Sequence, residues 1–511
     1  MIKTKLTYGE PAADISGAST GAAGAGVHIL FVTEEEAGGT TPLVQEHIDG
    51  ELRRAVSRGL FKGKPEQAFS APTLGLFKMP YVLFVGYRPG EGREGLRLAA
   101  AAAAKELKAL AAETASFDLR ASILQEEVKA LGAAAVSQAL TEGLLLALHD
   151  RLPLKREPAV RYQPLHVGLV PDAGLQQLAP QGEWEQGIAS GLVIVEAVAY
   201  ARDLTNLPGN DLTPERLAFF AEELAHEYEL DVEIIDEWTA AEQGMGGLLG
   251  VGQGSVNPPR MIVLHYKGDP DSDEVWGWIG KGITFDTGGI SLKSPPGMEE
   301  MISDMGGAAA VLGALRAVAE LKAKANIVAV IPAAENMPSD RALKPGDVLT
   351  TMSGYTIEVV NTDAEGRIVL ADGLTTAIRR GATRLVDVAT LTGAVMQTLG
   401  YEATGAVTNH PELLKEIMAA ADRAGERVWE LPVYPEFRKP LKSVAADLRN
   451  GSGRYGAATT GGLFIGHFAE GLPWVHLDIG GSSWLEEDKA LEPKGATGSI
   501  TRTLVELVCR K

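Results

Sequence analysis

From about residue 190 onward, short apolar segments of strand length alternate with longer segments of helical character. Alternation of this kind is typical of a largely parallel sheet covered by helices, and such sheets bind ligands at the carboxyl ends of their strands. Thr213 followed by Pro214 is typical of a helix start. The strands that we expect are 231–235, 261–266, 275–280, 327–332 and 385–388, and the helices are 191–202, 214–228, 308–324 and 368–380.

The N-terminal region also has an α/β pattern. We expect strands at 27–33, 80–87 and 167–170, a helix over the alanine-rich segment 96–112, and a loop over the small residues 17–26. Segment 171–187 is richer in Gln, Pro and Gly and has no clear period, so it is predicted to be a linker. The fold class is therefore α/β with two domains, 1–170 and 188–511, each a mixed or largely parallel sheet flanked by helices.

Composition limits the classes of protein that this chain can belong to. A length of 511 residues suggests two or three domains, and 45% hydrophobic residues allow a large core. The 47 Lys and Arg against 67 Asp and Glu give a net charge of −20, which disfavours nucleic acid and anionic membrane as partners. Cys509 is the single cysteine, so no intramolecular disulfide can form. With no signal peptide or membrane span expected, we predict a cytoplasmic protein.

Two short segments concentrate charge among glycines and apolar residues. The first is GKGITFDTGGISLK at 280–293, which continues to Asp304, and the second is NTDAEGRIVL at 361–370. The first follows an expected strand and the second precedes an expected helix, which is where an α/β sheet places its ligands. The charged residues of the two segments are Lys281, Asp286, Lys293, Asp304, Asp363, Glu365 and Arg367.

These charges as a set indicate a metal site. Each charge taken singly fits an exposed turn, but isolated charges are costly to bury and are usually paired or bound to metal. Asp363 and Glu365 point to the same side of an extended stretch. Four converging carboxylates would repel each other unless divalent cations lay between them. Paired metals about 3.5–4 Å apart activate a bridging water for hydrolysis.

Other glycine- or charge-rich segments do not match known motifs. The glycines of 244–254 do not follow a strand in the register of a dinucleotide site, and 269–273 lacks the glycine and glutamate of a calcium loop. The histidines form no close pair, and His476 is interpreted as a packing residue.

The two charged segments resemble the leucine aminopeptidase (cytosol aminopeptidase) family. The resemblance includes GKGITFDTGG, the M-x-x-M-x-x-D-M-G-G-A-A-A pattern of 298–310 and NTDAEGR. It covers about residues 190–511, so it implies that the C-terminal domain is catalytic. Flanking matches are ARDLTNLPGNDLTP at 201–214, AENMPSDRALKPGDVL at 334–349, DVATLTGA at 387–394 and WVHLDIG at 474–480.

The resemblance implies a set of roles. The activity would be removal of the N-terminal residue from peptides, by hydrolysis through a water that bridges the metals. Leu and other apolar first residues would be preferred. Two divalent ions per subunit would be held. Mn or Zn is favoured, and the oxygen ligands with one amine also admit Co or Mg. Asp286 and Glu365 would bridge the ions, Lys281 and Asp304 would complete one ion, and Asp363 would complete the other. Lys293 would polarise the scissile carbonyl, and Arg367 would hold bicarbonate as a proton shuttle. Met301, Thr390 and Gly393 would line the pocket for the first side chain. The family also implies a homo-hexamer.

A metal-ligating lysine must be neutral, so the resemblance implies a lowered pKa for Lys281 beside two cations. The sequence departs from the family at two positions. Thr287 stands where Ser is common, and Ile302 stands where Lys is common, next to Met301.

Three alternatives remain at this point. A two-metal phosphoesterase would use a similar carboxylate set, although the flanking matches favour peptides. A DNA-binding regulator that keeps the aminopeptidase fold is disfavoured by the net charge of −20. An inactive paralogue is disfavoured because all seven metal and catalytic positions have the expected residue types.

Overall fold

The structure is a computed structural model that describes residues 4–9, 26–151, 154–156, 164–451, 453 and 455–509. The chain divides into two compact units. The first comprises Met1–Val195 with Glu487–Pro493, and the second comprises Glu196–Glu486 with Lys494–Lys511. The loop expected at 17–26 lies, except for Gly26, outside the described residues.

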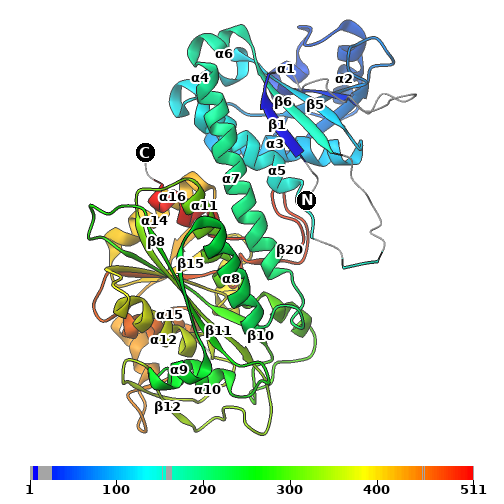
Figure 1. Cartoon of the computed structure of the whole chain (residues 1–511). Coiled ribbons are helices and arrows are strands. Elements are labelled where there is room, and N and C mark those ends of the chain that lie inside the picture. The colour runs from blue at the N-terminus through cyan, green and yellow to red at the C-terminus, as the bar shows by residue number, and fades with distance from the viewer. Residues whose placement is uncertain are drawn as a thin grey trace. The chain divides into compact units, whose positions relative to one another are not determined.

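The first unit contains a six-stranded sheet in the order β1-β6-β5-β2-β4-β3 (Figure 1). All neighbours are parallel except β3 and β4. The strands are β1 (Thr4–Tyr8), β2 (Gly26–Val32), β3 (Ala68–Pro72), β4 (Tyr81–Gly86), β5 (Thr114–Leu119) and β6 (Leu165–Pro171). The helices are α1 (Glu34–Gly38), α2 (Glu46–Ser57), α3 (Gly92–Ala109), α4 (Ala121–Leu131), α5 (Ala133–Ala147), α6 (Ala173–Leu178) and the first part of α7 (Gln181–Thr205).

Segment 171–187, which was expected as a linker, contains helix α6 and the start of α7. Asp172 caps α6 by accepting from the Leu175 amide at 2.9 Å. Trp184 is fully buried, and its carbonyl accepts a hydrogen bond from Ser137 Oγ at 2.9 Å. This local cap and this tertiary contact together order a segment whose composition is typical of a loop. The division between the two units falls within α7, at Val195 and Glu196.

The second unit is built on a nine-stranded mixed sheet in the order β16-β15-β18-β14-β9-β11-β8-β7, with β10 also paired to β11. The central pairs β18-β14-β9-β11 are parallel, and the outer pairs β11-β8, β8-β7 and β15-β18 are antiparallel. The strands are β7 (Asp231–Ile235), β8 (Arg260–Lys267), β9 (Trp276–Gly280), β10 (Gly282–Asp286), β11 (Asn326–Asn336), β14 (Arg384–Ala389), β15 (Thr404–Thr408), β16 (Val428–Glu430) and β18 (Trp474–Asp478).

Two groups of helices flank this sheet (Figure 1). One group is α8 (Pro214–Tyr228), α11 (Gly306–Glu320), α14 (Pro411–Ala424) and α16 (Thr501–Val508), and the other is α10 (Gly246–Gly252), α12 (Gly366–Arg379) and α15 (Ala457–Ile465). Buried Ile279 and Val330 of the sheet share a hydrophobic core with Ile368 and Leu374 of α12. Burial of such apolar faces stabilises the unit.

The remaining elements are α9 (Glu237–Glu242), η1 (Met298–Ser303), α13 (Gly393–Leu399), η2 (Pro435–Leu441), η3 (Gly466–Ala469), and the short strands β12 (Val348–Thr350), β13 (Thr356–Glu358), β17 (Leu448–Arg449), β19 (Trp484–Leu485) and β20 (Gly495–Ala496).

The five strands and four helices that the sequence predicted in this unit are all confirmed, with ends that shift by a few residues except at the start of α7. Thr213 caps α8 by accepting from the Arg216 amide at 3.2 Å. His476, interpreted as a packing residue, is fully buried in β18 and pairs with Asp387 of β14 at 2.6 Å.

By length and composition, one described helical stretch, 298–320, could span a membrane, but 89% of its apolar window is buried inside the fold. The bent pair α4 and α5 passes the same test of length and composition.

Candidate metal centre

The first charged segment runs through the carboxyl end of the central sheet. Lys281 stands between β9 and β10, and its amide and carbonyl bond to the Val388 carbonyl and the Ala308 amide at 3.0 and 2.9 Å. The sheet and the first turn of α11 therefore fix its backbone. Asp286 ends β10, and Asp304 follows the short helix η1. One acid therefore comes from the end of a strand, and the other comes from the turn between η1 and α11.

Lys281 is buried among carboxylates. Its side chain is 3% exposed, and Nζ lies 2.7 Å from Asp304 Oδ2 and 3.0 Å from Glu365 Oε1. Nζ also donates to the Thr390 carbonyl at 3.0 Å. Gly366 makes this approach possible, because a Cβ at that position would lie 2.7 Å from Nζ.

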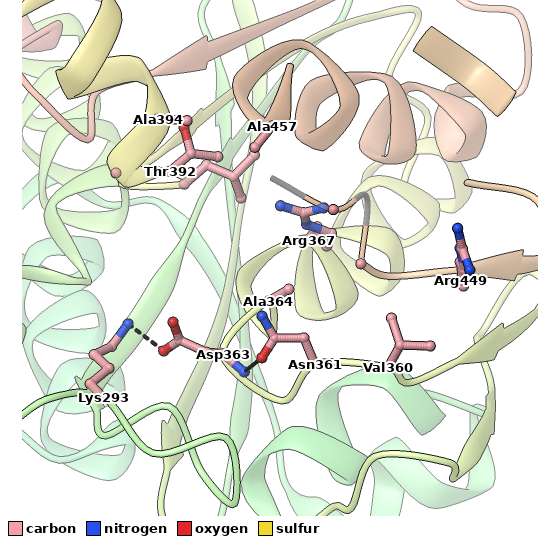
Figure 2. A pocket seen from close by; sticks show the side chains of 14 residues that line it. Lys293, Val360, Asn361, Asp363, Ala364, Arg367, Thr392, Ala394, Arg449 and Ala457 are labelled. Carbon is pink, nitrogen blue, oxygen red and sulfur yellow. Dashed lines mark hydrogen bonds and ion pairs between the residues drawn. The ribbon is translucent and has the colours of Figure 1, made fainter. Parts of the chain in front are cut away.

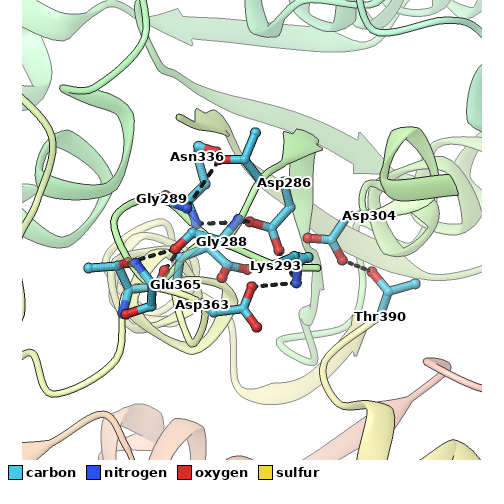
Figure 3. Close-up of polar contacts among 12 residues, drawn as sticks. Asp286, Gly288, Gly289, Lys293, Asp304, Asn336, Asp363, Glu365 and Thr390 are labelled. Carbon is cyan, nitrogen blue, oxygen red and sulfur yellow. Dashed lines mark hydrogen bonds and ion pairs between the residues drawn. The ribbon is translucent and has the colours of Figure 1, made fainter. Parts of the chain in front are cut away.

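Asp286, Asp363 and Glu365 form a compact carboxylate cluster (Figure 3). One oxygen from each lies within 4.8 Å of the others. Lys293 Nζ pairs with Asp286 Oδ2 at 2.8 Å and with Asp363 Oδ1 at 2.5 Å. The two charged segments of the sequence therefore meet in one site, as predicted.

The turn after Asp286 depends on glycine. Gly288 has φ +85°, and its amide donates to Asp286 Oδ1 at 2.8 Å. A Cβ there would lie 2.7 Å from Asp363 Oδ1. Thr362 joins this turn to the second segment, because its Oγ1 donates to the Gly288 carbonyl at 2.6 Å.

Thr287 shows why one departure from the family is mild. Its Oγ1 donates to the Asn336 carbonyl at 2.8 Å and accepts from the Gly289 amide at 3.1 Å. A serine hydroxyl can make both bonds. Ile302, the other departure, is buried on η1 at 9% exposure and does not present a charge near the site.

Burial and mutual repulsion raise the pKa of three of these acids. Burial, with the nearby Glu365 and Asp304 carboxylates, raises the pKa of Asp286 to about 8. Burial likewise raises the pKa of Asp304 to about 6, although the Lys281 ammonium opposes the shift. Burial also raises the pKa of Asp363. These carboxylates need more positive charge than the two lysines supply.

The pKa of Lys281 shows the opposite tendency from that of a metal ligand. Burial alone would lower it, but the Asp304 and Glu365 carboxylates outweigh burial and raise the pKa above its ordinary value. The lowered pKa expected from the sequence requires neighbouring cations, and the carboxylates of the chain by themselves act in the other direction.

The residues fit a divalent metal. Glu365 Oε2 is buried and has no hydrogen-bond partner among the described residues. A buried carboxylate oxygen without a donor costs free energy that a cation would recover. The donor set is carboxylate oxygen with one amine, which suits Mn and Zn among others.

Arg367 lies at the start of α12, two residues after Glu365, and lines a cavity of about 570 Å³ (Figure 2). Its Nη1 donates to the Asn450 carbonyl at 2.7 Å, while Nε is buried and has no partner among the described residues. Burial lowers the pKa of Arg367. The cavity is lined by Lys293, Val360, Asn361, Asp363, Ala364, Arg367, Leu391, Thr392, Gly393, Ala394, Arg449, Gly451, Gly453 and Ala457.

The three residues expected to line the first side-chain pocket are placed differently. Gly393 lines the cavity. Thr390 is not among the residues that line this cavity, and its Oγ1 donates to Asp304 Oδ1 at 2.7 Å (Figure 3). Met301 is half-buried on η1, three residues before Asp304, and is not among the cavity-lining residues.

Several residues that orient the site were missed by the sequence analysis. Asn336 Nδ2 donates to Asp286 Oδ1 at 2.8 Å and to the Thr362 carbonyl at 3.0 Å. Asp478 accepts from Thr392 Oγ1 at 2.7 Å and from the Leu391 amide at 3.1 Å, which fixes the loop after β14. Both lie inside motifs that matched the family, AENMPS and WVHLDIG, so the motif was a usable signal for each.

Comparison with known proteins identifies the family. The model of the cytosol aminopeptidase family, catalytic domain, matches residues 199–505, and the model of the N-terminal domain of the same family matches residues 29–158.

The chain belongs to the cytosol aminopeptidase family. Members of this family are metal-dependent peptidases, so the chain is a hydrolase that acts on peptides.

Relatives match over most of their length. A probable cytosol aminopeptidase of Alkaliphilus metalliredigens (strain QYMF) is 40% identical over 473 residues, which is 91% of this chain and 92% of that one. A probable cytosol aminopeptidase of Bacillus subtilis (strain 168) is 42% identical over 477 residues, 91% of this chain and 92% of that one.

Two solved structures are similar to the whole chain. A mutant of tomato leucine aminopeptidase has a TM-score of 0.84 and 31% identity, covering 100% of this chain and 97% of that one. The bottromycin maturation enzyme BotP in complex with Mn has a TM-score of 0.81 and 35% identity, covering 95% and 99%. The predicted resemblance and the α/β fold class are thus confirmed, and none of these comparisons supports the DNA-binding alternative.

Proposed function

We propose that the chain is a two-metal aminopeptidase that removes an apolar first residue, such as Leu, from peptides. The observation that supports this most is the group of Lys281, Asp286, Asp304, Asp363 and Glu365, buried except for the half-buried Asp363, whose four carboxylates outnumber the two nearby lysine cations. Mn or Zn would be the ions, consistent with the Mn complex of BotP.

The proposed ligands divide between two ions. Asp286 and Glu365 would touch both, Lys281 and Asp304 would complete one, and Asp363 would complete the other. Bound ions would supply Lewis acidity and lower the pKa of water near the scissile bond. The chain's own residues would then bind, orient and stabilise the substrate.

Asp304 is proposed to receive the free α-amino group of the peptide. Its carboxylate is held by Lys281 on one side and by Thr390 on the other, so its direction is fixed before substrate arrives. A carboxylate in a fixed position selects an ammonium or amine at one distance from the scissile bond. Cleavage after residue one follows from that selection.

Lys293 is proposed to donate from Nζ to the scissile carbonyl oxygen. It lines the cavity with its side chain 24% exposed, and Nζ reaches the carboxylates on which the site is built. A cation there stabilises the negative charge that develops on the carbonyl oxygen. Burial alone would lower the pKa of Lys293, but the neighbouring carboxylates, Asp286 and Glu365 foremost, outweigh burial and raise it.

Arg367 is proposed to hold a bicarbonate ion, whose chemistry would be proton transfer to and from the attacking water. The support is a buried guanidinium that lines the cavity and has an unpartnered Nε within the described part of the chain. Such a group attracts a small anion.

The first side chain is proposed to lie near Met301, Thr390 and Gly393 and to be apolar. One methylene in such a pocket is worth about 1–3 kcal/mol, so Leu and Met would be favoured over Asp and Glu with broad selectivity. We also propose a cytoplasmic homo-hexamer, as the family resemblance implies, and sedimentation of the purified protein would test the hexamer.

The test of the proposed function compares leucine anilide with N-acetyl-leucine anilide. The two share the scissile bond and the side chain, but acetylation removes the free amine. We expect hydrolysis of the first and none of the second. Equal hydrolysis of both would point to another amidohydrolase. Loss of activity on both after chelation, with recovery on addition of Mn²⁺, would tie the reaction to the metal.

A further inference from the structure

The cavity beside the metal centre is lined by more positive than negative charge. It extends from Lys293 and Asp363 past Arg367 to Arg449, and Figure 2 shows Lys293 and Arg449 at opposite ends of the view with Arg367 between them. Its lining includes three cationic side chains and one carboxylate, Asp363. The cavity as a whole therefore favours an anionic group.

Two of the three cations have partners or a proposed role. Lys293 is paired with Asp286 and Asp363. Arg367 is buried, donates to the Asn450 carbonyl and is the proposed bicarbonate site. Arg449 remains, and among the described residues no carboxylate lies within ion-pair distance of it.

Arg449 is held in place without being neutralised. It ends β17, which pairs with β13 at Glu358, and its Nε donates to the Pro440 carbonyl at 2.7 Å. This bond fixes the guanidinium, and its two terminal nitrogens have no partner among the residues that the structure describes; the side chain is half-buried. A pre-oriented planar cation with two free donor groups is suited to a carboxylate, which it can bind in a bidentate manner.

The direction of the substrate decides which carboxylate this is. The amine of the peptide lies toward Asp304 and the first side chain toward Gly393, according to the proposed function on which this inference rests. The remaining cavity wall, at Asn361, Ala364 and Arg449, then faces the part of the peptide that leaves. We propose that Arg449 binds a carboxylate on the leaving fragment, so that the site favours peptides with negative charge just after the scissile bond.

Two substrate features present this carboxylate. One is the C-terminal carboxylate of a dipeptide, and the other is the side chain of an acidic second residue. Leu-Gly against Leu-Gly amide isolates the first, and Leu-Asp amide against Leu-Asn amide isolates the second. Leucine anilide has no carboxylate and reports the basal activity.

The experiment measures kcat/KM for these substrates in the wild type, Arg449→Gln, Arg449→Lys and Arg438→Gln. Arg438 is the matched control, because it is an exposed arginine on η2 that does not line the cavity. In the wild type we expect the carboxylate-bearing member of at least one pair to be favoured about fivefold, the size of one charge-assisted contact at a half-exposed site. The pair that shows the preference identifies the source of the carboxylate.

Arg449→Gln should abolish that preference, mainly through KM, while leaving leucine anilide hydrolysis unchanged. Arg449→Lys should keep part of it and Arg438→Gln all of it. Added salt should weaken the wild-type preference, which tests the contact without any substitution. A wild type with no preference in either pair, or a preference that survives Arg449→Gln, would overturn the inference alone. A wild type that cannot hydrolyse leucine anilide would overturn the proposed function and the inference with it.

Discussion

Thr390 Oγ1 donates a hydrogen bond to Asp304 Oδ1 over 2.7 Å, and the carbonyl of the same residue accepts from Lys281 Nζ over 3.0 Å. This single residue, which directly follows β14, thus orients both groups that are proposed to complete one metal ion. Outer partners of this kind fix the direction of a ligand and the charge on it. Thr390 is therefore a positioning residue as well as a candidate pocket residue.

Thr390→Val should weaken the site while preserving side-chain shape. The substitution removes the donor to Asp304, and loss of an outer partner typically costs about 10–100-fold in metal affinity or activity. Competition with a chelator, together with kcat on leucine anilide, measures both. Thr390→Ser keeps the hydroxyl and should stay close to wild type. Wild-type metal affinity and kcat in the valine variant would show that the contact has no functional role.

Lys293→Ala and Arg367→Ala should each lower kcat strongly while metal content stays near that of the wild type. Loss of one oxyanion donor typically costs about 10²–10³ in rate, and Lys293 is proposed to be such a donor. Arg367→Ala should also remove any activation by added bicarbonate. Steady-state kinetics and elemental analysis are the measurements. Metal loss in Lys293→Ala would mean that Lys293 is a metal ligand. An effect on KM alone would mean that the side chain binds the substrate and the transition state equally strongly.

Gly288→Ala should disrupt the carboxylate cluster. The added Cβ would lie 2.6 Å from the Ser291 carbonyl and 2.7 Å from Asp363 Oδ1, so Asp363 must move. The matched control is Gly297→Ala. Gly297 has φ +83°, nearly that of Gly288, but its Cβ would meet nothing within 4 Å. Both variants pay about 1–2 kcal/mol for the left-handed backbone, and only Gly288→Ala should lose metal and activity. Similar losses in both would assign the effect to backbone strain.

The strands and helices of the second unit could be predicted because their apolar segments and helix-start residues are clear local signals in the sequence. Segment 231–235 matches β7 in full, and Thr213-Pro214 marks the start of α8. Segment 171–187 was not predicted in the same way. The Asp172 cap of α6 is a local signal within a composition typical of a loop, and the start of α7 depends on burial of Trp184, which contacts Ser137. Contacts distant in the sequence override a weak local pattern.

The site could be predicted in part. The sequence brought Lys281, Asp286, Asp304, Asp363 and Glu365 together through the family resemblance, and their charges alone indicated metal. The supporting contacts were not predicted, because Asn336, Thr390 and Asp478 lie at the ends of other strands and reach the site through hydrogen bonds that only the fold defines. The motifs that contain Asn336 and Asp478 indicate that these residues matter, and not which atoms they contact. No spacing rule in the sequence indicates which amide or hydroxyl faces which carboxylate.

Asp372 of α12 should make stability depend on pH. It is fully buried and accepts from the Leu248 and Met352 amides at 2.9 and 2.8 Å, and burial raises its pKa to about 6. The folded state therefore holds this proton more tightly than the unfolded state, whose pKa is near 3.8. The contribution of Asp372 to the free energy of unfolding falls as pH rises from about 4 to 6, by on the order of 3 kcal/mol.

In the variant Asp372→Asn the side chain cannot ionise, so the free energy of unfolding lacks this pH-dependent contribution. Denaturant unfolding at several pH values should show the variant gaining stability relative to the wild type between about pH 4 and 6. Above that range the difference between the two should be constant. Parallel stability curves across the whole range would contradict the raised pKa.

The most direct test of the two-metal proposal is a titration of metal-free protein with Mn²⁺, following bound metal and hydrolysis of leucine anilide together. We predict that activity reaches its plateau at two ions per chain. Asp286→Ala and Glu365→Ala, which each remove a proposed bridging ligand, should bind less metal and show no activity. Full activity at one ion per chain, or without any ion, would contradict the two-metal site.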